Sequence, residues 1–150
     1  MAISTVPLKC RIHGPPEIKA GSMLPVTFTI ANPSEQDVRI LNWQTPLEGS
    51  LTAGTFVITR DGAPVQYVGE MVKRGAPTPD DYVTIPAGAS SGQTTDLARG
   101  YGPFLPGVHK IRFVGRLFDV ATPDVLIPRT GGLQEELEIA SGEMTVRVKP

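Results

Sequence analysis

Apolar and polar residues alternate along most of the chain, and this alternation limits the possible folds more than any other feature. Val26, Phe28 and Ile30 occupy every second position of one segment, and residues 107–114 repeat the pattern over a longer stretch. Successive side chains of a β-strand point to opposite faces, so a period of two indicates strands with one buried face. The chain is therefore expected to fold from β-strands.

Turn signals separate the alternating segments. The 150 residues include 16 glycines and 15 prolines, which interrupt helices because Pro lacks a backbone N–H and Gly weakens helix interiors. Asp61-Gly62 is a strong hairpin signal between residues 56–60 and 65–68. Such signals recur at about 8–12 residues, as in sandwiches. We predict one domain over residues 1–150, an all-β, antiparallel, immunoglobulin-like β-sandwich of seven to nine strands.

The remaining elements follow from the same reading. Further strands are expected at residues 6–12, 25–32, 38–43, 82–85, 94–97 and 143–148. Residues 133–139 are compatible with a short helix, but strand is favoured there. Trp43 is expected to be a central core aromatic. Residues 73–81 and 121–132 are rich in turn formers, so both are predicted to be long loops, where binding residues usually lie.

The charge balance excludes several classes of partner. The 14 basic and 15 acidic residues give a net charge of −1, whereas nucleic-acid binders show a basic excess. A polybasic membrane-surface protein is excluded for the same reason, and no apolar run approaches the roughly 18 residues of a membrane span. The N-terminus lacks the features of a signal peptide, and the compartment stays open. A basic cluster is not expected, because acidic residues are interleaved with the cations: Arg99, Lys110, Arg112 and Arg116 with Asp96 and Asp119.

No catalytic or metal-binding motif is convincing. Residues 88–92, Gly-Ala-Ser-Ser-Gly, match the nucleophile elbow, but that elbow needs a strand-to-helix turn and both flanks are strand-like. A hydrolase at Ser90 is therefore the weakest hypothesis. Cys10 is expected to be a core residue with His13 on the opposite strand face. His13 and His109 are expected at the surface or on edge strands, and no metal site or cofactor is predicted.

The pair Lys73-Arg74 is the most interesting feature outside the strands. These two cations open a Pro-rich loop, whose stiffness lowers the entropic cost of presenting them to a partner. A rigid loop with a basic tip could enter an acidic pocket, as substrate-like inhibitors do. The alternative is an ordinary solvated loop.

One family is similar to this chain over residues 5–148. The matching segments are residues 41–49 (Leu-Asn-Trp-Gln-Thr-Pro-Leu-Glu-Gly), 56–58, 62–69, Lys73-Arg74 with Pro77, Asp81-Tyr82, Ile85 with Ala87-Gly88, Asp96-Leu97 and Tyr101. In this order they resemble the N-terminal propeptide domain of bacterial deuterolysin-like, lysine-preferring zinc metalloendopeptidases. That domain keeps a catalytic domain latent and assists its folding. No zinc-binding helix follows in this chain, so the resemblance implies the regulatory half alone.

The resemblance implies a function and a set of binding residues. The chain is expected to be a non-enzymatic inhibitor or folding assistant of a zinc metalloendopeptidase that occludes the active-site cleft. The partner-binding residues carried over are Lys73, Arg74, Asp81 and Tyr82, with Lys73 or Arg74 in an acidic pocket. Trp43, Pro46 and Glu48 match too, with a structural task.

Two further expectations concern other partners. The alternative to the inhibitor is a structural, adhesion or carbohydrate-binding module, for which Tyr67, Tyr101 and Phe104 are the candidate aromatics. Exposure of two of them side by side would favour that alternative. A free sheet edge could also pair two copies of the chain in a weak homodimer.

Overall fold

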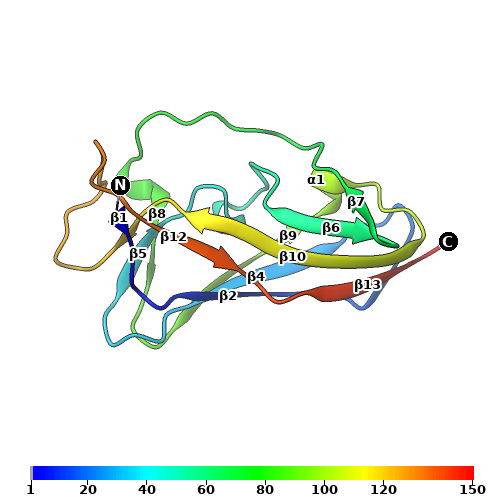
Figure 1. Ribbon diagram of the computed structural model, residues 1–150, viewed down its shortest axis with the longest axis horizontal. Coiled ribbons are helices and arrows are strands. Elements are labelled where there is room, and N and C mark those ends of the chain that lie inside the picture. Colours follow the sequence, from blue (N-terminus) through cyan, green and yellow to red (C-terminus); the bar gives the residue numbers. More distant parts are fainter. Residues whose placement is uncertain (1) are drawn as a thin grey trace.

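The computed structural model describes residues 2–150 and shows a β-sandwich with a smaller sheet at one end (Figure 1). Nine of the strands have at least four residues, which confirms the predicted all-β sandwich. These are β2 (Lys9–His13), β4 (Pro25–Ala31), β5 (Val38–Leu41), β6 (Phe56–Arg60), β8 (Tyr82–Ile85), β9 (Ser90–Asp96), β10 (Gly107–Leu117), β12 (Glu135–Ala140) and β13 (Met144–Lys149). Four shorter strands complete the set: β1 (Ala2–Ile3), β3 (Glu17–Lys19), β7 (Ala63–Val65) and β11 (Val120–Ala121).

Strand β10 forms the centre of the largest sheet. One of its edges pairs antiparallel with β6, and its other edge pairs antiparallel first with β13 and then with β12. The residues between β12 and β13 do not pair with β10 as a strand. There the backbone N–H of Phe113 on β10 donates instead to Ser141 Oγ at 2.9 Å. Strands β1 and β3 add the two parallel pairings, with β12 and β13 respectively.

The second layer is the antiparallel sheet β2-β4-β9, and the end sheet has the order β11-β5-β8. Buried Asn32 lies at the corner where β4 leads to β5 and β8 leads to β9. Its side-chain amide donates to the carbonyls of Gln36 at 2.8 Å and Ile85 at 2.9 Å. This residue satisfies backbone groups that the change of sheet would otherwise leave unpaired.

Aromatic rings join the two main layers. The rings of Phe28 on β4 and Phe113 on β10 have centroids 4.6 Å apart, and Phe56 on β6 meets Phe113 edge-on at 5.4 Å. Buried Tyr101 also reaches this cluster, because the backbone N–H of Phe56 donates to its hydroxyl at 2.9 Å. Burial raises the pKa of Tyr101 to about 12. Each ring pair adds about 0.5–1.5 kcal/mol beyond its area burial.

Several local expectations are corrected. Trp43 is only partly buried and lies outside the core, because β5 ends at Leu41. His109 was expected at the surface, but it is 1% exposed on the inner face of β10. The predicted strand at residues 65–68 ends at Val65, and the predicted strand at residues 6–12 begins at Lys9.

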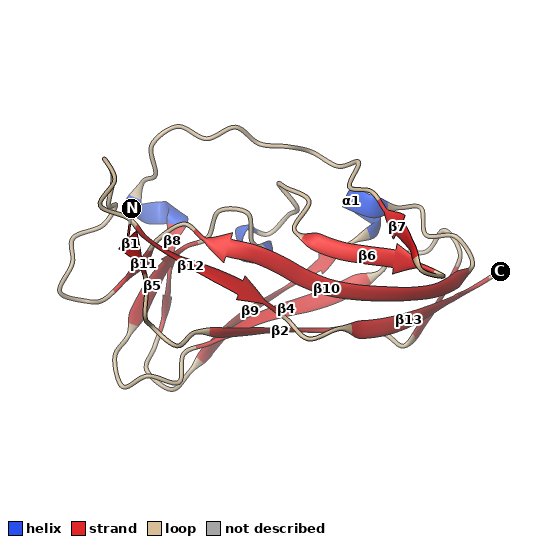
Figure 2. Cartoon of the chain, viewed as in Figure 1, coloured by secondary structure: helices blue, strands red, loops and turns tan. Residues whose placement is uncertain are grey.

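The helical content is small. One α-helical turn, α1 (Ala98–Tyr101), was not predicted, and two 3-10 helices, Pro46–Glu48 and Pro79–Asp81, complete the described elements (Figure 2). Strand β12 confirms the preference for strand at residues 133–139. Within residues 2–150 there is no helix with the length and apolar character needed to cross a membrane.

Candidate functional site

The candidate site is the long connection from β7 to β8, residues 66–81, which we call the strap. In Figure 1 the strap arches above β6 and runs along the long axis of the molecule from the β7 end to the β8 end. It contains no strand and has one 3-10 helix, Pro79–Asp81, at its end. Three anchors, described next, fix its course.

The first anchor is Tyr67, whose ring sits in a slot between glycines. A Cβ on Gly100 would come within 2.6 Å of this ring, one on Gly69 within 2.8 Å and one on Gly54 within 3.0 Å. The ring meets the core residue Tyr101 edge-on at 5.2 Å. The slot exists because three positions near the ring carry no side chain, so the beginning of the strap is tied to α1.

The second anchor is Arg74. Its guanidinium pairs with the carboxylate of Glu48 and lies 5.4 Å from the centre of the Trp43 ring. The side chain of Glu48 is 9% exposed and also accepts hydrogen bonds from the backbone of Gln44 at 2.8 Å and from Thr52 Oγ1 at 2.6 Å. The charge of Glu48 and the ring of Trp43 together hold the guanidinium of Arg74 against the body of the molecule.

The third anchor is the end of the strap. Pro77 is buried, and Asp81 accepts a hydrogen bond from the backbone N–H of Thr78 at 2.9 Å, which closes a capping box. The backbone carbonyl of Asp81 accepts from Asn42 at 2.9 Å. Asp81, predicted to contact a partner, therefore shapes the strap in the isolated chain.

Between the anchors, side chains of the strap alternate in direction. Val72 is partly buried and its backbone N–H donates to Thr52 at 3.2 Å, and Arg74 is held against the body of the molecule as described. Met71, 78% exposed, and Lys73, also exposed, face solvent. Lys73 forms no ion pair with any residue from 2 to 150. Both predicted cations are exposed, but Arg74 is engaged by Glu48, so Lys73 is the one available to a partner.

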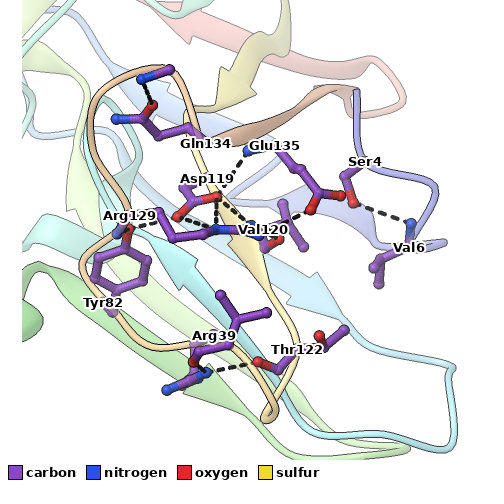
Figure 3. A network of polar contacts seen from close by, with 12 residues as sticks. Ser4, Val6, Arg39, Tyr82, Asp119, Val120, Thr122, Arg129, Gln134 and Glu135 are labelled. Carbon is purple, nitrogen blue, oxygen red and sulfur yellow. Dashed lines mark hydrogen bonds and ion pairs between the residues drawn. The ribbon is translucent and has the colours of Figure 1, made fainter. Parts of the chain in front are cut away.

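Tyr82, the fourth predicted site residue, lies apart from Lys73 in a polar network (Figure 3). Its hydroxyl donates to Asp119 Oδ2 at 2.6 Å, and the backbone N–H of Arg129 donates to that hydroxyl at 3.2 Å. Partial burial and the bond to Asp119 raise the pKa of Tyr82 to about 12. Tyr82 is thus a neutral donor that holds the start of β8.

The centre of this network is a buried ion pair. Asp119 is fully buried, and Arg129 binds its Oδ1 through Nη2 at 2.6 Å while the Nη1 of Arg129 reaches Glu135 Oε2 at 2.9 Å. The bonds to Asp119 raise the pKa of Arg129. The network fixes the second predicted loop, residues 121–132, of which Ala121 belongs to β11, to β8 and β12.

The remaining sequence candidates do not form a second site. Ser90 opens strand β9 rather than a helix, so the nucleophile-elbow geometry is missing. Burial raises the pKa of the Cys10 thiol to about 11, which makes it a poor nucleophile. Tyr101 and Phe104 are buried, so neither offers a face to a sugar. Among the described residues, no three His, Cys, Asp or Glu side chains are grouped as metal ligands.

Sequence reasoning missed the contacts that anchor the strap. Glu48 was given only a structural task; it accepts the backbone N–H of Gln44, and its ion pair with Arg74 spans 26 positions. Trp43 was assigned to the core rather than to the strap. The available signal was that both residues belong to the same matched segment, residues 41–49.

Comparisons with known proteins connect the chain to a protease. No protein-family model matches it. The chain is 38% identical over 89 residues, 59% of its length, to an extracellular protease of Aeromonas hydrophila, and it spans about a quarter of that relative. Among solved structures, the CARDB domain of a Pyrococcus furiosus protein in complex with di-metal ions aligns over 95% of this chain and 92% of that one, with 10% identity and a TM-score of 0.38. The protease is the similarity that bears on function: this chain resembles part of an extracellular protease.

Proposed function

We propose that this chain is a non-enzymatic domain that binds a zinc metalloendopeptidase and occludes its active-site cleft, as an inhibitor or a folding assistant. The strap would lie in the substrate groove, with Lys73 in an acidic pocket. The similarity to an extracellular protease supports a protease as the partner. The propeptide resemblance of residues 5–148 supports the regulatory role.

The single observation that carries the proposal is the outward lysine on a strap held at both ends. Arg74 on one side of Lys73 is bound to Glu48, and Tyr67 and Pro77 fix the flanks. Ordering a free loop on binding costs about 0.5–1.5 kcal/mol for each side chain immobilised, and a strap already ordered avoids much of that cost. Such a strap also resists the distortion that cleavage requires.

The four predicted residues then divide into two roles. Lys73 is the residue that would enter the partner's pocket, because Arg74 is engaged with Glu48 and Trp43. Arg74, Asp81 and Tyr82 would act as positioning residues that fix the course of the strap and the start of β8. This division differs from the sequence prediction, which left either cation to fill the pocket.

The test uses the purified Aeromonas hydrophila extracellular protease and the full chain. We expect stoichiometric inhibition by the wild type and about tenfold or greater loss of potency in Lys73→Ala, since a buried charge pair is lost. Lys149→Ala, which removes an exposed cation paired with Glu17, is the matched control and should inhibit normally. A wild-type chain that neither binds nor inhibits the protease would refute the proposal.

A further inference from the structure

Cations gather on the outward face of the large sheet, on its two central strands. Lys110 and Arg112 are two positions apart on β10 and are both exposed, so their side chains point the same way. Arg147 on β13 lies opposite Val108, which makes it a diagonal neighbour of Lys110. We call Lys110, Arg112 and Arg147, with the exposed valines beside them, Val57, Val108 and Val114, the basic face.

The acidic residues that the sequence interleaves with these cations lie elsewhere. Asp119 is fully buried against Arg129, and Asp96 on β9 accepts the backbone N–H of Leu24 at 2.8 Å in the other layer. The expectation of a mixed, solvated surface is therefore wrong for Lys110 and Arg112. Arg116, further along β10, does have acidic partners, Glu136 and Glu138.

The three cations of the basic face form no ion pair within residues 2–150. Exposed Glu17 on β3 lies directly opposite Arg147, but its carboxylate pairs with Lys149 at 3.0 Å. Like charges on neighbouring positions of a sheet repel one another and disfavour the fold. An acidic partner would relieve this repulsion.

Exposed valines border the cations. Val57 on β6, Val108 and Val114 are 48%, 40% and 39% exposed, and Val57 lies directly opposite Arg112. Exposed Lys and Arg on an edge strand such as β2 guard against aggregation, but β10 is paired on both edges and needs no such protection. A mixture of apolar and basic side chains on a central strand suits a protein surface better than a nucleic-acid backbone, which calls for a longer basic track.

The basic face ends beside a loop that holds an anchor of the strap. Val114, at the border of the basic face, and Gln44, on that loop, line opposite sides of a cleft of about 460 Å³. Gln44 donates its backbone N–H to Glu48, the partner of Arg74. A stable protein interface buries about 800 Å² on each side, more than a short strap can supply, so a protease held by the strap needs further contact area.

We propose that the basic face is a second docking surface that binds an acidic patch of the protease beside its cleft. This inference rests on the proposed function and adds the chemistry of the partner surface. Lys110, Arg112 and Arg147 would pair with carboxylates, and the valines would pack against apolar side chains between them. The strap would then supply occlusion, and the basic face would supply affinity and association rate.

The experiment measures binding of the full chain to the Aeromonas hydrophila extracellular protease as a function of salt. We expect Lys110→Glu with Arg112→Glu to bind about tenfold or more weakly, mainly through slower association, and to lose most of the salt dependence. The matched control is Lys9→Glu with Arg11→Glu, which reverses two exposed cations at the same spacing on β2. It should bind like the wild type, and circular dichroism melts verify that both variants fold.

Each result separates the two proposals. If the wild type binds and the Lys110/Arg112 variant binds equally well, the basic face is not a docking surface, and the proposed function stands. If the wild type does not bind, the proposed function fails, and the docking inference fails with it. The chain could instead bind a random-sequence DNA duplex or anionic phosphatidylserine vesicles in a charge-dependent way and not bind the protease. That result would refute the proposal that the basic face binds a protein.

Discussion

Arg74 is bound to Glu48 on the body of the molecule, so that the two adjacent, exposed cations of the strap are held differently. The carboxylate of Glu48 is nearly buried, and it joins Arg74 to the backbone of Gln44 and to Thr52. Lys73 has no such partner among the described residues and faces outward. The specificity that we propose for the strap depends on this one ion pair.

Removing the charge of Glu48 is expected to loosen the strap. Glu48→Gln should lower the free energy of unfolding by about 1 kcal/mol or less, because Arg74 is 26% exposed. The larger effect should be on local opening, since Arg74 is then free to enter the pocket of trypsin. Mass spectrometry of limited trypsin digests should show severalfold faster cleavage at residues 73–74. The control is Glu35→Gln, which changes an exposed glutamate and should be cleaved by trypsin at the wild-type rate. Equal cleavage rates in the wild type, Glu48→Gln and Glu35→Gln would contradict the role of Glu48 in anchoring the strap.

Gly100→Ala is expected to destabilise the chain although Ala favours helices. A Cβ at this position would lie 2.6 Å from the Tyr67 ring and 2.7 Å from Leu51 Cδ1, and overpacking of this kind costs about 1–3 kcal/mol. Urea denaturation should give a correspondingly lower free energy of unfolding. Gly142→Ala, where nothing lies within 4 Å of the new Cβ, is the control and should be near neutral. A stabilised Gly100→Ala variant would show that the slot is not tight.

Arg129→Ala is expected to cause the largest loss of stability. It leaves the carboxylate of Asp119 buried without its cation, and breaking a buried pair in this way costs about 3–5 kcal/mol. Arg116→Ala breaks an exposed pair with Glu136 and should cost about 1 kcal/mol or less. Thermal melts of the two variants measure the contrast, and similar losses would contradict the role given to the network.

His109 is expected to make stability depend on pH. Burial is the main cause that lowers its pKa, Arg60 lowers it further, and Gly107 and Asp61 act against the shift. The unfolded chain therefore binds a proton more readily than the folded chain. The stability that neutral His109 allows is therefore fully present above the ordinary histidine pKa of about 6.5. It is lost as the pH falls through that value, because the unfolded chain then takes up a proton that folded His109 does not.

The pH dependence can be assigned by substitution. Denaturation curves measured from pH 7.5 down to pH 5 should show a falling free energy of unfolding in the wild type. The variant His13→Gln, which replaces an exposed histidine, should show the same fall. His109→Gln should flatten that dependence, whatever its effect on absolute stability. An unchanged slope in His109→Gln would mean that another group is responsible.

Local patterns predicted the strands well, because a strand's alternation is written in adjacent residues. The Asp61-Gly62 hairpin is present, with both residues at positive φ as a two-residue turn requires. Strand β10 was expected at residues 107–114 and continues to Leu117. Its alternation also implies an inward His109, but the prediction treated histidine by its polarity and placed it at the surface.

The site was harder to predict, since its contacts join residues far apart in the sequence. The loop containing Lys73 was correctly picked out as long, but nothing near residue 74 indicates that Glu48 will bind Arg74. Tyr82 likewise meets Asp119 across 37 positions. Interleaved Asp96 and Asp119 concealed the basic face, because neighbours along the chain were taken for neighbours in space.

The occlusion of a protease cleft by the strap is tested most directly by steady-state kinetics. The Aeromonas hydrophila extracellular protease is assayed on a short lysine-containing peptide while the full chain is added in increasing amounts. Occlusion predicts that the apparent KM rises with the chain concentration while kcat is unchanged, and that Lys73→Ala weakens this effect. A fall in kcat at constant KM, or no change in either constant, would contradict occlusion.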